Sequence, residues 1–174
     1  RHHAGLVEEA GDSSVPEPAL SQAFRFAHTW RVGEPPARVF AVLADADAYP
    51  QWWPQIRSVT RIGPDDGEAL VRSLLPWSLR LRLHRTVTDP AAGRLAVRLT
   101  GDLTGWSSWE VLPDGAGTRA EYRQQVDLSA GGLGRLLDRV VVGRLARPML
   151  VANHAWMMSS GERGLRLFFA ADIR

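Results

Sequence analysis

Two histidines stand where a side chain that exchanges protons would face the interior. His28 interrupts the apolar face of a strand expected at residues 24–32, and His154 lies on a long helix expected over residues 147–170. An imidazole titrates near neutral pH and can move a proton to or from an enol, so these are the candidates for acid/base catalysis. For each residue, the alternative is a hydrogen bond that is only structural.

Other side chains would hold a ligand rather than react with it. Gln124 and Asn153 are polar residues on expected inward faces, and either Arg72 or Ser73 faces inward, depending on the register of their strand. Burying a polar group without a partner is costly, so such residues point to a ligand or to an internal hydrogen bond. Flat rings would complete the wall and suit a planar or polycyclic apolar ligand, unless they are simply core; they are Trp30, Trp52, Trp106, Trp109 and Trp156, with Trp53 beside them.

The composition excludes several kinds of chemistry. The 174 residues include neither cysteine nor lysine, so all 21 basic side chains are arginine. Disulfides, thiolate nucleophiles, Cys-ligated metals and Schiff-base lysines are therefore excluded. The five histidines lack the spacing of a zinc motif. Gly115–Ala120 loosely matches a dinucleotide-binding pattern, but a strand follows it where that motif requires a helix, so the segment is a hairpin. We expect neither a metal nor a cofactor.

The charge balance gives no indication of a nucleic-acid partner. The net charge is only +2, and the high isoelectric point follows from having almost nothing that titrates between histidine and arginine. A stripe of Arg80, Arg82 and Arg98 can pair with Glu110 and Glu121 on neighbouring strands. No apolar run reaches the roughly 18 residues of a membrane span, and no signal core is visible near Arg1. We expect a cytoplasmic protein, with a homodimer as one possible assembly.

The elements that must position these residues follow from the periodicity. Residues 1–22 form an expected flexible arm, and residues 23–174 form one domain. In residues 78–88, Leu79, Leu81, Leu83 and Val87 alternate with polar residues, and Arg85 breaks the inward series. Two short helices follow the first strand, and a further short helix precedes Pro148. The expected strands cover residues 24–32, 56–62, 68–75, 78–88, 95–99, 104–112 and 118–128.

This element order predicts an α+β fold with an internal space. Consecutive hairpins give an antiparallel sheet, one face of which must be covered. The C-terminal helix is long enough to lie along the sheet, but one helix cannot fill the concave side of a curved seven-stranded sheet. The space left between them is the predicted cavity.

Several segments resemble the SRPBCC superfamily, which includes START domains, birch-pollen-allergen-like proteins and polyketide cyclases. They are the first strand and helix start at Trp30–Phe40, the aromatic bend Tyr49–Pro54 and the last hairpin Asp114–Arg119. Arg72–Pro76, Gly101–Trp106 and Asn153–Met158 look like a bacterial polyketide cyclase/dehydrase subgroup. The resemblance covers about residues 24–170. It implies a helix-grip fold, in which the sheet wraps around the C-terminal helix and encloses a hydrophobic pocket.

Three functions are compatible with such a fold. The first is binding of a lipid-like or polycyclic aromatic molecule in the cavity. The second is a polyketide cyclase/aromatase or dehydratase, in which His28 or His154 moves the proton while Arg72 or Gln124 positions carbonyls. That mechanism requires at least one histidine to reach the cavity. The third is a protein-interaction module, which requires a filled interior and a large apolar patch outside.

Overall fold

The computed structural model describes residues 23–74, 78–127 and 146–172. Seven strands form one antiparallel sheet in the order β1-β7-β6-β5-β4-β3-β2, so β2 to β7 follow one another as hairpins. This confirms the topology expected from the alternating pattern. The strands are β1 Phe24–Val32, β2 Ile56–Arg61, β3 Asp66–Arg72, β4 Ser78–Asp89, β5 Arg94–Gly101, β6 Thr104–Asp114 and β7 Gly117–Asp127.

The helices occupy the expected places in the chain. α1 (Pro36–Ala44), the 3-10 helix η1 (Ala46–Ala48) and α2 (Tyr49–Trp52) connect β1 to β2, and α4 (Ala146–Ala171) ends the fold. Pro36 begins α1, where its missing N–H would have no helical partner in any case. The expected arm at residues 1–22 and the short helix before Pro148 lie outside the described residues.

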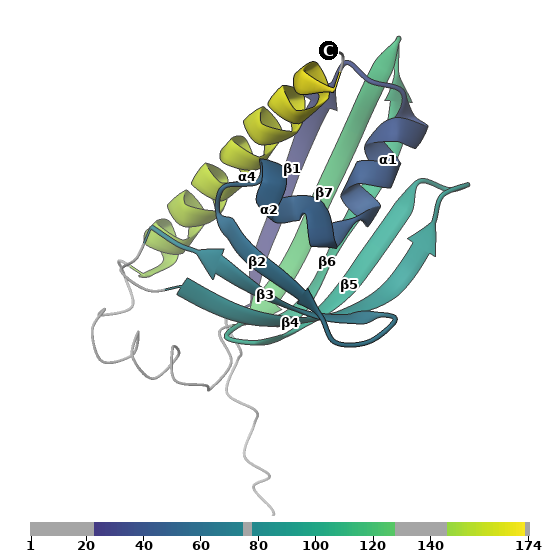
Figure 1. The fold of residues 1–174 in the computed structure, drawn as a ribbon. Helices are drawn as coiled ribbons and strands as arrows, with labels where there is room; N and C mark the ends of the chain where they lie inside the picture. The colour runs from purple at the N-terminus through teal and green to yellow at the C-terminus, as the bar shows by residue number, and fades with distance from the viewer. Residues whose placement is uncertain (1–22, 75–77, 128–145, 173–174) are drawn as a thin grey trace, which may run out of the picture.

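The sheet curls around the long helix. Figure 1 shows α4 running along one side of the curved sheet next to β1, with α1 and α2 on the same side. α1 packs against β6 and β7, while α2 fills the space between β2 and α4. The core between these layers centres on Trp30, whose ring lies 5.2 Å from that of Trp53 and 4.6 Å from that of Trp109 between centroids.

The residues of α4 that face the core are not all the ones that the sequence predicts. The helical spacing of Leu145, Met149, Asn153 and Trp156 predicts that they share the inner face of the helix. Asn153 does line the cavity described below, but Met149 is 42% exposed and Trp156 is only half-buried. Leu145 lies outside the described residues. The buried side chains follow the adjacent stripe instead, and they are His154, Met158, Leu165 and Phe169.

Two glycines let α4 approach its neighbours closely. A Cβ at Gly161 would lie 2.5 Å from a ring atom of Trp53, and one at Gly164 would lie 1.8 Å from the carbonyl oxygen of Trp52. Real Cβ atoms do not come so close, because steric repulsion rises steeply below van der Waals contact. The contact of α4 with α2 therefore depends on these residues having no side chain.

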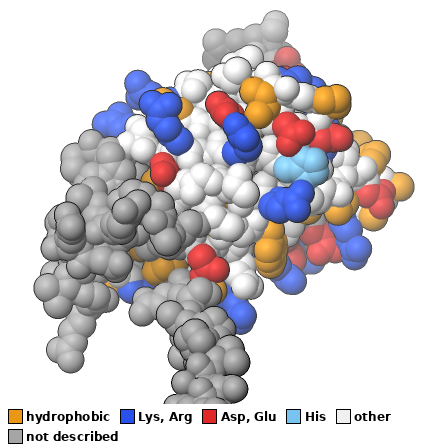
Figure 2. Space-filling view, turned by 90° about the horizontal axis from the view of Figure 1, so that it is seen from below, with side chains coloured by type: hydrophobic (Ala, Val, Ile, Leu, Met, Phe, Trp, Pro, Cys, Tyr) orange, Lys and Arg blue, Asp and Glu red, His pale blue; other side chains and the backbone are white. Residues whose placement is uncertain are grey.

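The outer surface carries charges of both signs. Figure 2 shows acidic and basic side chains interspersed on the face seen there. Among the described residues, the arginine stripe (Arg80, Arg82 and Arg98) does not form the expected ion pairs with Glu110 and Glu121. Arg82 binds Glu68 at 3.0 Å, and Glu121 binds Arg119 on its own strand. Within the described ranges, no helix is long and apolar enough to cross a membrane.

Candidate functional site

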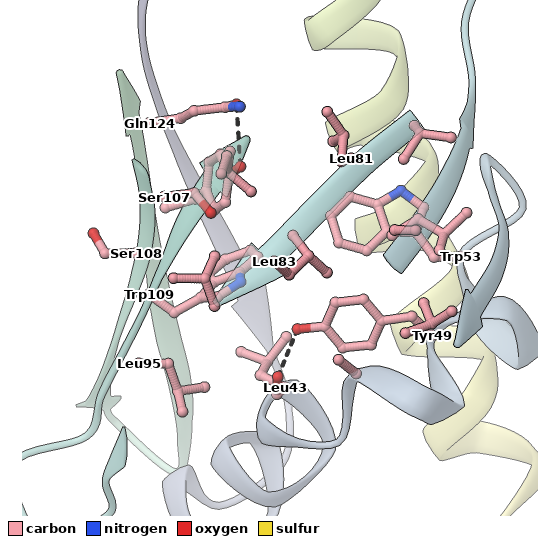
Figure 3. A pocket seen from close by; sticks show the side chains of 18 of the residues that line it. Leu43, Tyr49, Trp53, Leu81, Leu83, Leu95, Ser107, Ser108, Trp109 and Gln124 are labelled. Carbon is pink, nitrogen blue, oxygen red and sulfur yellow. Dashed lines mark hydrogen bonds between the residues drawn. The ribbon is translucent and has the colours of Figure 1, made fainter. Parts of the chain in front are cut away.

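A cavity of about 190 Å³ lies between the concave face of the sheet and the helices. That volume is more than ten times the roughly 15 Å³ that one water needs. Figure 3 shows leucine side chains and the rings of Tyr49, Trp53 and Trp109 around the open space. Its apolar wall includes Leu43, Ile56, Val59, Val71, Leu79, Leu81, Leu83, Leu95, Val97, Leu99, Leu103 and Met157.

Arg85 brings a positive charge to this apolar wall. It occupies the same face of β4 as Leu81 and Leu83, and its Nη2 lies 3.5 Å from the carbonyl oxygen of Ala44. Among the described residues, no carboxylate lies within ion-pair distance of its guanidinium. An arginine side chain stays charged, so it offers hydrogen-bond donors and a positive field to an acceptor or anion in the cavity.

Gln124 connects the cavity wall to a chain of hydrogen bonds. Its Oε1 accepts one bond from the hydroxyl of Tyr122 at 3.1 Å and another from Nε2 of His154 at 2.7 Å. Nδ1 of His154 in turn lies 3.0 Å from Nε2 of His28. Figure 3 shows the Gln124 side chain reaching from β7 into the site. The four side chains come from β1, β7 and α4, so the fold itself brings them together.

The environment of this chain keeps its groups neutral. Burial, with a smaller contribution from His28, lowers the pKa of His154 to about 3. Burial also lowers the pKa of His28 and raises the pKa of Tyr122 to about 12. The ring of Phe26 stacks on His154 at 3.9 Å between centroids, which removes water from one face of the imidazole. At neutral pH this hydrogen-bond chain thus consists of uncharged donors and acceptors.

A smaller pocket of about 50 Å³ adjoins the cavity at the same place. The two share the polar residues Gln124, Asn153 and His154 as well as Leu79 and Leu103. The smaller one is lined further by apolar side chains such as Phe24 and Leu150. Asn153 Oδ1 accepts a hydrogen bond from the backbone N–H of Leu74 at 2.6 Å. The polar residues therefore stand between two apolar spaces.

Five of the residues predicted at the cavity line it, namely Trp53, Trp109, Gln124, Asn153 and His154. His154 therefore reaches the cavity, as a cyclase or dehydratase mechanism requires of at least one histidine. His28 lies behind His154 and does not line the cavity. Trp30 and Trp52 are buried in the core beside it, with 1% and 4% of their surface exposed, and Trp156 lies on another side of α4.

Arg72 and Trp106 do not line the cavity, and of the two alternatives Arg72 and Ser73 it is Ser73 that faces inward. Side chains alternate along a strand, and Ala69 and Val71 occupy the inward positions of β3, so Arg72 points out and is exposed. Just beyond the strand, Ser73 is buried and lines the smaller pocket. Trp106 is separated from the inward Trp109 by three positions, an odd number, and is 44% exposed on the opposite face.

Arg85, Ser107 and Tyr122 line the cavity but were not among the predicted ligand contacts. Arg85 had a signal, since it interrupts an inward leucine series. Ser107 and Tyr122 share parity with Trp109 and Gln124 on their strands, so the alternation could have identified both. Within the described ranges, no group of three histidine or acidic side chains is placed to hold a metal ion.

Solved structures share this architecture at low sequence identity. The Zhui aromatase/cyclase from Streptomyces sp. R1128 is 21% identical, with a TM-score of 0.69 over 87% of this chain and 96% of that one. A START superfamily protein from Mycobacterium smegmatis is 16% identical, with a TM-score of 0.63 over 82% and 94% of the two chains. The protein TTHA0849 from Thermus thermophilus is 18% identical, with a TM-score of 0.61 over 82% and 95%. At these identities the likeness shows the fold.

No curated protein sequence is significantly similar to the chain. The family model described as "Polyketide cyclase / dehydrase and lipid transport" matches residues 23–154, from the start of β1 to His154. This match includes every strand, the hydrogen-bond chain at Gln124 and all of the cavity wall except Met157. With the helix-grip fold in agreement, the chain belongs to the polyketide cyclase/dehydrase and lipid transport family of the SRPBCC superfamily.

Proposed function

We propose that this protein binds a hydrophobic small molecule, lipid-like or polycyclic aromatic, in the cavity under α4. The observation that carries the proposal is the cavity itself, a space of about 190 Å³ with a wall of leucine side chains and aromatic rings. Ligand sites are typically apolar clefts with a few placed polar groups, as here. The protein-interaction alternative needs a filled interior, so the cavity removes its support.

The polar groups at the wall indicate which part of a ligand they would receive. Arg85 offers guanidinium N–H donors, and Gln124 has an amide nitrogen without a hydrogen-bond partner within the described residues. A ligand with carbonyl, phenolate or carboxylate oxygens would satisfy these donors, while its apolar body contacts Trp53 and Trp109. Function in the cytoplasm, a homodimeric state and the absence of nucleic-acid binding remain predictions.

The proposal can be tested with a variant in which a larger side chain on the cavity wall fills the space. Ala69 is 7% exposed and lines the space from β3, so Ala69→Phe places a ring where the ligand would lie. Titration with a fluorescent polycyclic probe should show micromolar binding to the wild type and at least about tenfold weaker binding to this variant. Ala27→Phe on the exposed face of β1 is the matched control and should bind like the wild type. No uptake by the wild type at micromolar concentration would contradict the proposal.

A polyketide cyclase/aromatase or dehydratase is the second candidate, favoured by His154 at the wall of the same cavity. Both of its ring nitrogens are engaged, one with Gln124 and one with His28. Proton transfer to a ligand would therefore require one of these bonds to open. Incubation with a linear poly-β-ketone separates the two functions, because a binding protein returns the compound unchanged and a cyclase returns a ring-closed product.

A further inference from the structure

The hydrogen-bond chain at the cavity wall has a direction that the chemistry of its atoms determines. Oε1 of Gln124 can only accept, so Nε2 of His154 must carry the proton in the 2.7 Å bond between them. A neutral imidazole then has its lone pair on Nδ1, which accepts the 3.0 Å bond from Nε2–H of His28. The Tyr122 hydroxyl is the second donor to Oε1. Every proton in the chain thus points towards Gln124.

This direction leaves the NH₂ group of Gln124 as the part of the amide available to a ligand. Turning the amide over would set its N–H groups against the Nε2–H of His154. That arrangement is relieved only if His154 and then His28 change tautomer. The neutrality of both rings, which follows from their burial and lowered pKa values, keeps this coupling intact at neutral pH.

We propose that His28 and His154 are positioning residues that hold the amide nitrogen of Gln124 towards the cavity, so that the site selects ligands carrying a carbonyl or another acceptor oxygen at this point. The inference rests on the proposed binding function and concerns which ligands the cavity prefers. His28 does not line the cavity, so its influence on the ligand acts only through His154.

The selectivity can be measured with two probes of nearly the same shape, 9-fluorenone and fluorene, which differ in a carbonyl in place of a methylene. We expect the wild type to bind fluorenone about tenfold more tightly, the effect of one additional hydrogen bond in an apolar site. His28→Phe keeps a ring but removes the donor to His154. It should reduce the preference to less than about threefold, because fluorenone binding weakens more than fluorene binding.

Rescue by a conservative variant distinguishes positioning from a general packing role. The side-chain amide of His28→Gln can donate to Nδ1 of His154 from a similar reach, so this variant should retain the tenfold preference. A His28→Phe protein that keeps the preference, or a wild type that binds both probes equally, overturns the inference without affecting the binding proposal. If the wild type binds neither probe, the binding proposal fails and the inference falls with it.

A measurement on the wild type alone covers the case in which a variant does not fold. Nitrogen-15 chemical shifts of the imidazole rings report which nitrogen carries the proton. We expect the Nε2–H tautomer for His154, with Nδ1 as an acceptor. The Nδ1–H tautomer in His154 would mean that Gln124 presents its oxygen to the cavity, and it would overturn the inference.

Discussion

His154 combines an apolar surrounding with full hydrogen bonding. Phe26 stacks on its ring, and both of its nitrogens have partners, so the folded protein favours the neutral imidazole. Burial, followed by the nearby His28, lowers its pKa from 6.5 to about 3. Between those values an unfolded chain binds a proton that the folded chain does not. Stability is therefore full above about pH 6.5 and is lost as the pH falls towards 3.

This linkage predicts an acid destabilisation that one substitution should reduce. One such group contributes about 1.4 kcal/mol per pH unit, so its share is about 2 kcal/mol between pH 6.5 and about pH 5. Urea unfolding at a series of pH values should show a shallower decline for His154→Gln than for the wild type. Ala27→Phe, on the exposed face of β1, changes no titratable group, so it is the control and should keep the wild-type decline. Equal slopes in the wild type and His154→Gln would contradict the prediction.

At the level of elements, the sequence periodicity predicted where the strands and helices lie, but it predicted less well which of their side chains point inward. Alternation along residues 78–88 identified β4 and its inward leucines, and the turn residues identified the hairpins. The faces of Arg72 and Trp106 depend on where each strand's inward series begins, and large aromatic rings were assigned inward by type instead of by parity. The phase of α4 depends on tertiary contacts at Gly161 and Gly164, which no helical repeat reveals.

The close approach of α4 to α2 leads to a prediction in which two effects have opposite signs. Glycine is about 1 kcal/mol less favourable than alanine inside a helix, so Gly164→Ala should stabilise α4 as an isolated element. In the folded protein, the new Cβ would lie 1.8 Å from the carbonyl oxygen of Trp52, which is backbone and cannot rotate away. We expect a net loss of about 3 kcal/mol in the free energy of unfolding, measured in urea.

Gly33→Ala is the matched control for this substitution. A Cβ at Gly33 meets nothing within 4 Å, so the free energy of unfolding should change by less than about 1 kcal/mol. A Gly164→Ala protein that is more stable than the wild type would show that helix propensity outweighs the contact, and that α4 can move away from α2 without loss.

At the scale of the whole molecule, the cavity is where all the layers meet. Its wall includes residues from α1, α2, α4 and every strand except β1, so a bound molecule would contact both sides of the fold at once. A ligand that binds only the folded state stabilises the protein by about 2.7 kcal/mol at one hundred times its dissociation constant. In a chain of 174 residues, this corresponds to a rise in Tm of roughly 5–10 °C.

Thermal unfolding with and without a saturating polycyclic probe therefore measures whether the molecule responds as one unit. The wild type should show a single transition that moves up by this amount, because opening any layer exposes the ligand. Ala69→Phe, with its cavity filled, should show no shift at the same probe concentration, and Ala27→Phe should shift like the wild type. A ligand-induced shift in Ala69→Phe as large as in the wild type would place the binding outside the cavity.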